Sequence, residues 1–128
     1  MSISIVRLGT PRKPGEGLRI GTVRRPPRGV PKSDIAKRDY YDVWFPNLSP
    51  TAELVKEAMQ ATDKREWDAF KRKFRHQMKE PGPSRELDVL AALSQHTNFS
   101  IGCYCENEDH CHRSVLRELL SERGADIH

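Results

Sequence analysis

The chain of 128 residues has no run of about 20 apolar residues, the length that a membrane-spanning helix needs. Its first residues, MSISIVRLG, lack the apolar core and the cleavage site of a secretory signal peptide. It has only three cysteines, an odd number that does not suit a disulfide framework. We therefore expect a cytoplasmic protein with free cysteines and no membrane partner. The sequence leaves the oligomeric state open.

Apolar residues make up only 36% of the chain, and it contains no internal repeat or low-complexity tract. A chain of this length buries roughly two-thirds of its unfolded surface, so it can fold without a disulfide or a metal. We expect a single domain over residues 1–128. The net charge of +4 is uneven, because residues 1–38 carry ten Lys or Arg and two acidic residues. This basic region is compatible with a nucleic-acid or phosphate ligand, and equally with internal charge balance.

Short β-branched segments and longer amphipathic segments predict the secondary structure. The expected strands are residues 2–8, 18–25, 40–46 and 98–105, and the expected helices begin at Ser49 and Ser84 and span residues 63–79 and 112–123. The order β-β-(β)-α-α-α-β-α indicates a small α/β domain with a partly parallel central sheet flanked by helices.

The stretch CYCENEDHCHR at residues 103–113 holds all three cysteines and two histidines. It follows a strand and opens a helix, so it is expected at the carboxyl end of the sheet, where α/β proteins bind ligands. One interpretation is a reactive thiol, with Cys105, Cys111 and His112 as catalytic candidates and neutral His112 as a general base. The acidic residues between Cys105 and Arg113 argue against a thiolate that attacks phosphate.

Two further uses of this stretch stay open beside buried structural thiols. A metal site would use Cys103, Cys105, Cys111 and His110, with zinc as the metal. The C-x-C-x5-C spacing matches none of the usual zinc patterns, so no cofactor is expected. The other use is anion binding by Arg113 and the backbone amides at the start of the helix.

The stretch RRPPRG at residues 24–29 places three arginines on a loop that two prolines stiffen. Guanidinium groups held together in this way need carboxylates or phosphates to neutralise them. If the strand that ends before this loop pairs with the strand that ends at Cys105, the arginine-rich loop and the cysteine-rich stretch meet at one sheet edge. We therefore expect a small anionic ligand, phosphate or carboxylate, bound by Arg24, Arg25, Arg28 and Arg113, and we leave open whether the protein is an enzyme.

The helix expected over residues 63–79 gives a nucleic-acid alternative, because its polar face carries six Lys or Arg. Together with the basic N-terminus, this face could bind a phosphate backbone. No recognised nucleic-acid motif is present, and Trp67, Phe70 and Phe74 lie on the apolar face, where they suit a core better than base stacking.

Residues 23–58, from VRRPPRGVPKSD to SPTAELVKEA, resemble the YeaO-like branch of the DUF488 family. That branch has a strand ending in Arg, a W-P-R-G motif, a K-K-x-D-L segment and an acid–Pro-Ser-x-x-L-R helix. The stretch CYCENEDHCHRSVL is similar to the wider DUF488 pattern, with a Cys near a strand end and C-H-R opening the last helix. This chain has Pro26 where the family often has Trp. The resemblance covers residues 3 to 124 and implies a small cytosolic α/β protein of uncharacterised function, with motif positions Arg24, Arg25, Pro27, Arg28, Gly29, Cys105, Cys111, His112 and Arg113.

Overall fold

The computed structural model describes residues 1–128 and contains one four-stranded sheet with four α-helices. The strands are β1 (Ile3–Arg7), β2 (Leu18–Gly21), β3 (Val43–Trp44) and β4 (Phe99–Cys103), and the helices are α1 (Ala52–Gln60), α2 (Lys64–Gln77), α3 (Pro81–Leu93) and α4 (His112–Glu122). This confirms the predicted α/β class and the predicted order of elements. All four strands are parallel, in the spatial order β1-β4-β2-β3.

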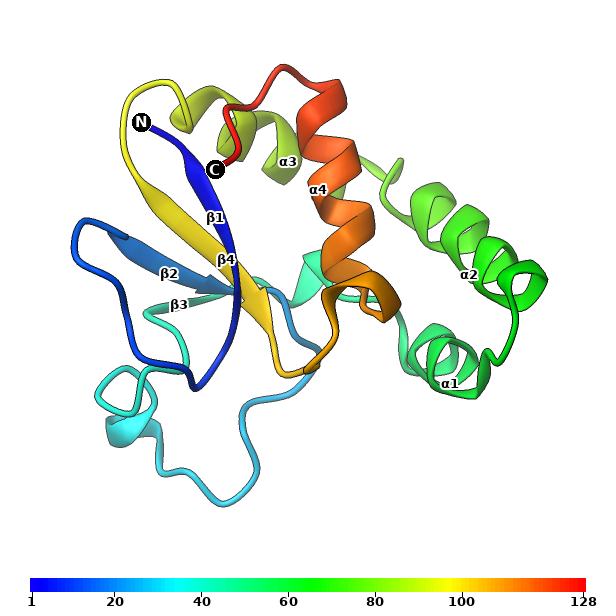
Figure 1. Cartoon of the computed structure of the whole chain (residues 1–128), viewed down its shortest axis with the longest axis horizontal. Helices are drawn as coiled ribbons and strands as arrows, with labels where there is room; N and C mark the ends of the chain where they lie inside the picture. Colours follow the sequence, from blue (N-terminus) through cyan, green and yellow to red (C-terminus); the bar gives the residue numbers. More distant parts are fainter.

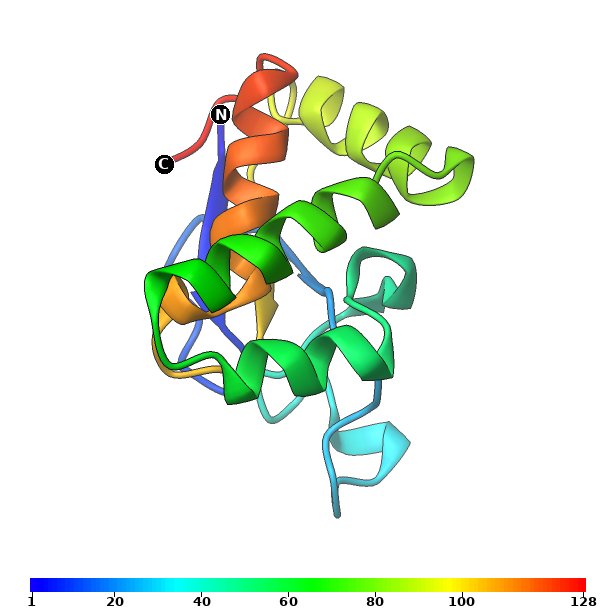
Figure 2. The ribbon, with the colours of Figure 1, turned by 90° about the vertical axis from the view of Figure 1, so that its right-hand side faces the viewer.

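The helices pack on one face of the sheet, and α4 lies between the sheet and α2 (Figure 1). Figure 2 shows α1 and α2 in front of α4 when the molecule is turned. Alternate residues of the strands, among them Ile20, Phe99 and Ile101, point into the core beneath these helices. The core side chains of α2, Phe70 and Phe74, are fully buried, as their helical spacing predicts. None of the helices is long and apolar enough to cross a membrane.

The opposite face of the sheet is covered by irregular segments and holds a buried ion pair. Arg19 of β2 is fully buried, and its guanidinium makes a two-point contact with Glu16, with N–O distances of 2.8 and 3.0 Å. Its third nitrogen, Nη1, donates to the carbonyl oxygens of Thr10 and Asp39, and Ser100 of β4 donates to Glu16. The pair therefore ties two loops and two strands together with every strong donor satisfied.

Helix starts differ from the prediction at two places. Thr51, rather than Ser49, caps α1 by accepting a hydrogen bond from the Leu54 amide. The third helix begins at Pro81 and not after Ser84, which lies inside its first turn. Proline fits the first helical position because the amide it lacks would have no partner there.

Candidate functional site

The carboxyl ends of β2 and β4 form the site, because these two strands are paired neighbours. Gly21 of β2 aligns with Gly102 of β4. The chain after β2 is the arginine loop, residues 24–29, and the chain after β4 is the cysteine loop, residues 104–111. The expected meeting of the two loops at one sheet edge is therefore present in the structure.

Four hydrogen bonds hold the arginine loop and the end of β2 in place. The Tyr104 hydroxyl donates to the carbonyl of Arg25 at 2.8 Å, and the Trp44 indole donates to the carbonyl of Val23 at 2.7 Å. Arg24 donates to the carbonyls of Ser49 and Pro50, both at 3.0 Å. The arginine loop is thus attached to the end of β4 and to the segment before α1.

A cavity of about 300 Å³ opens between these segments. Its wall combines residues from the end of β2, the start of α1, the end of β4 and the start of α4, namely Val23, Arg24, Arg25, Ser49, Ala52, Val55, Cys103, Tyr104, Cys105 and His112. No carboxylate lines it. Arg25 is exposed and forms no ion pair in the structure, so its charge remains available to a ligand.

The other two arginines of the predicted anion site lie elsewhere. Arg28 lines a separate cavity of about 260 Å³ with Arg7 and Tyr104. Arg113 is buried and outside the wall of the main cavity. It donates from Nη2 to the carbonyl of Cys105 at 2.7 Å, and its buried Nε has no hydrogen-bond partner. Arg113 therefore supports the backbone of Cys105 and places an unpaired positive charge behind it.

Two of the three cysteines, Cys103 and Cys105, line the cavity, and Cys111 contacts Cys103 behind its wall. The Sγ atoms of Cys103 and Cys111 are 2.7 Å apart, and both side chains are buried. Cys105 is exposed, and its amide donates to the sulfur of Cys103 at 3.3 Å. Hydrogen bonds from the thiols of Cys103 and Cys111, with the charge of Arg113, lower the pKa of Cys105. Donation to Cys105 raises the pKa of Cys103. This group of three cysteines therefore favours one thiolate, on Cys105.

The acidic residues of the cysteine loop do not oppose this thiolate, contrary to the expectation from sequence. Glu108 forms a two-point ion pair with Arg117, with N–O distances of 2.7 and 3.1 Å. Glu106 is 88% exposed and lies 4.0 Å from Arg7. Asp109 is also exposed. Each carboxylate is paired or directed to solvent, so none is part of the cavity wall.

His112, the first residue of α4, is fixed by the end of β2. Its Nε2 lies 2.6 Å from the carbonyl oxygen of Thr22, which can only accept a hydrogen bond, so Nε2 carries the proton. Burial lowers the pKa of His112 to about 4. The imidazole is therefore neutral at pH 7, and its free Nδ1 faces the sulfur of Cys111 at 3.7 Å.

Cys103, Cys111 and His112 also form a group of three potential metal ligands, with atoms within 4.8 Å of one another. The histidine of the group is His112. His110 lies apart from it, with its ring 5.7 Å from that of Trp67. Two sulfurs bound to a tetrahedral zinc are about 3.8 Å apart. The pair at 2.7 Å would have to open by about 1 Å to accept zinc, so the observed arrangement does not fit that metal well.

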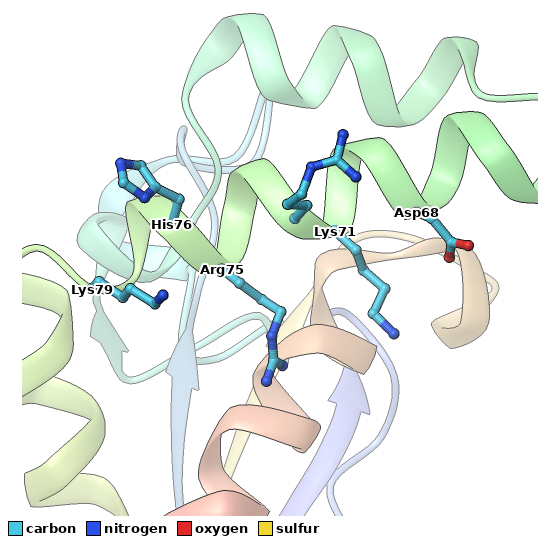
Figure 3. Close-up of a pocket in the computed structure, with 6 residues that line it drawn as sticks. Asp68, Lys71, Arg75, His76 and Lys79 are labelled. Atoms are coloured by element: carbon cyan, nitrogen blue, oxygen red, sulfur yellow. The ribbon is translucent and has the colours of Figure 1, made fainter.

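The basic face of α2 is partly neutralised by its neighbours. Figure 3 shows Lys71 and Arg75 extending toward α4. Both form ion pairs with Glu118 of that helix, and Arg75 also pairs with Glu122. The adjacent hollow of about 510 Å³ has no apolar side chain in its wall. It therefore offers no Phe, Tyr or Trp on which a base could stack, and His76 is the one aromatic ring in its wall. The exposed cations that form no ion pair are Arg65 and Arg72 of this helix and Lys79 just after it.

Comparison with known families agrees with the motifs at the two loops. The model of DUF488-N3a, described as the active DUF488-N3 subclade, matches residues 3–124. The chain belongs to this family. The match confirms the DUF488 resemblance and does not test the YeaO-like branch. No curated protein and no solved structure matches the chain.

The sequence alone did not reveal two features of the DUF488-N3a site. One is the contact between Cys103 and Cys111, which depends on how the cysteine loop returns to the sheet. The other is Tyr104, whose hydroxyl holds the arginine loop. Its position between two cysteines at a strand end was the only signal that could have drawn attention to it.

Proposed function

We propose that this protein is a thiol-dependent enzyme that acts on a small anionic substrate, with Cys105 as the nucleophile. The observation that carries the proposal is a single cavity that combines an unpaired cation, Arg25, with the exposed sulfur of Cys105 and no carboxylate. The matching family is described as an active subclade, and that description agrees with the proposal without naming a reaction.

The cavity dimensions support a small substrate. A volume of about 300 Å³ is at the lower end of ligand pockets, which suits a phosphate or carboxylate compound better than a polymer. Arg25 would bind the anionic group, and the amino end of α1 adds a positive dipole because Ala52 lies in the wall. The substrate would then present its electrophilic atom to Cys105.

Comparing an anionic with a neutral alkylating reagent tests this arrangement. Iodoacetate and iodoacetamide have the same reactive carbon, so the ratio of their rates at Cys105 reports the local charge. We expect Arg25→Gln to lower this ratio about fivefold, the factor that corresponds to a charge interaction of about 1 kcal/mol. Arg28→Gln removes the same charge from the same loop outside the cavity, and it should leave the ratio nearly unchanged.

Inorganic phosphate should slow the alkylation of Cys105 in the wild type and protect it less in Arg25→Gln. The anion site would be refuted if the ratio of the iodoacetate rate to the iodoacetamide rate were equal in wild type and Arg25→Gln, and phosphate gave no protection. Elemental analysis of protein purified without chelators is the second test. Stoichiometric zinc that resists removal until the protein unfolds would show that the cysteines form a metal centre, and it would refute the proposal of a thiol enzyme.

A further inference from the structure

The Cys103–Cys111 pair is not needed for a simple nucleophile, yet Cys103 shares the cavity wall with Cys105, and its sulfur accepts the Cys105 amide at 3.3 Å. The two sulfurs are 2.7 Å apart, against about 2.05 Å in a disulfide, so a small movement would join them. Cys103 ends a buried strand and Cys111 ends the loop before α4. One partner is therefore held by the sheet, and the other stands where the cysteine loop joins α4.

We propose that the three cysteines form a redox relay in which oxidation enters at Cys105 and ends as a disulfide between Cys103 and Cys111. The relay rests on the proposed function in one respect, that Cys105 is the reactive thiolate. The relay adds to the proposed function the two-electron reduction of an oxidant, which a single cysteine cannot complete with a return to the thiolate. The oxidant class is a hydroperoxide, which is small enough for the cavity.

The first step oxidises the sulfur that faces the cavity. The Cys105 thiolate attacks the terminal oxygen of the hydroperoxide, the O–O bond breaks, and an alcohol leaves after taking a proton from water. Cys105 is then a sulfenic acid. Negative charge develops on the leaving oxygen, and Arg25 in the cavity wall can stabilise it.

The second step uses the buried thiols. The sulfur of Cys111 attacks the sulfur of oxidised Cys105, a disulfide forms, and hydroxide leaves as water with the proton of the Cys111 thiol. His112 can pass this proton from the thiol to the leaving hydroxide, because its Nδ1 faces the Cys111 sulfur at 3.7 Å while Nε2 donates to Thr22. Cys103 then attacks Cys111, releases Cys105 as thiolate and loses its own proton to solvent.

The final disulfide is the one that the geometry favours. Cys103 and Cys111 are both buried and already in contact, whereas Cys105 is exposed. The relay therefore returns Cys105 to the cavity as thiolate and stores the oxidation in the protein interior. A dithiol reductant, small enough to reach the cysteine loop, would reset it.

Mass spectrometry of the wild-type protein after one equivalent of hydrogen peroxide tests the relay. The expected product has lost two hydrogen atoms, its peptide map links Cys103 to Cys111, and Cys105 still reacts with iodoacetamide. The result that would overturn the proposal is a gain of one or more oxygen atoms at Cys105 with Cys103 and Cys111 reduced. This readout needs no variant, so it does not depend on whether a substitution folds.

Two variants assign the order of the steps. Cys111→Ser should leave Cys105 as a sulfenic acid that dimedone traps, and then allow oxidation to the sulfinic acid. Cys103→Ser should stop at a disulfide between Cys105 and Cys111. A disulfide between Cys103 and Cys105 in Cys111→Ser, in place of the trapped sulfenic acid, would also overturn the relay. Failure of the anion site is seen separately, as a loss of the iodoacetate preference while the disulfide still forms.

Discussion

Acidification should destabilise this fold through one buried carboxylate, Glu16. Burial by itself would raise the pKa of Glu16, but hydrogen bonds from Arg19 and Ser100 outweigh it and lower the pKa from 4.5 to about 2. Because the folded pKa lies below the unfolded value, the stabilisation is present above about pH 4.5 and is lost as the pH falls toward 2. The difference of 2.5 between the pKa values, at about 1.36 kcal/mol for each unit, corresponds to about 3 kcal/mol.

Urea unfolding of the wild type and of Glu16→Gln at several pH values isolates this contribution. At pH 7 the variant should be less stable by about 3 kcal/mol, because Arg19 keeps a buried charge without its counterion. The difference between the two proteins should shrink toward zero as the pH falls from about 4.5 to about 2. Glu106→Gln, at an exposed side chain, is the matched control and should follow the wild type. A constant difference between wild type and Glu16→Gln over this pH range would refute the reasoning.

Three further predictions concern the site and the helices. The rate at which iodoacetamide alkylates Cys105 should be nearly constant between about pH 6 and about pH 9, because its pKa is lowered, whereas the rate for an ordinary thiol rises steeply in that range. Tyr104→Phe should cost about 1 kcal/mol in urea unfolding and weaken the iodoacetate preference, because the hydroxyl no longer holds Arg25; an unchanged preference would assign Tyr104 to stability alone. Asp63→Ala should lower the free energy of unfolding by about 1 kcal/mol, because Asp63 accepts the Glu66 amide at the start of α2; an unaltered unfolding midpoint would contradict this capping role.

The order of strands and helices could be predicted because each element carries its own local signal. The apolar spacing of Phe70 and Phe74 marks α2, and the proline and glycine segments mark the ends of the strands. Helix starts were less certain. The segment EPGP looks like a break between helices, yet Pro81 opens α3, because a proline can stand both after one helix and at the start of the next.

The chemistry of the site could be predicted only in part. Cys105 and Arg25 stand out because each lies in a loop that directly follows a strand, and the pairing of β2 with β4 brings the two loops together. The burial of Arg19 and Glu16 could not be predicted, since a basic and an acidic residue three positions apart usually lie at the surface. The Ser100 hydroxyl that donates to Glu16 comes from 84 residues further along the chain, and such a contact leaves no mark on local sequence spacing.

The position of β4 determines when the protein can fold. This strand comes late in the chain but lies between β1 and β2, so the two early strands cannot complete their hydrogen bonding until residues 99–103 have been synthesised. Pairing over such sequence distances slows folding, because a long stretch of chain must be ordered before any contact forms. A nascent chain that stops earlier would expose the edges of β1 and β2 to other polypeptides. The loops that follow β2 and β4 can therefore meet only after nearly the whole chain has been synthesised.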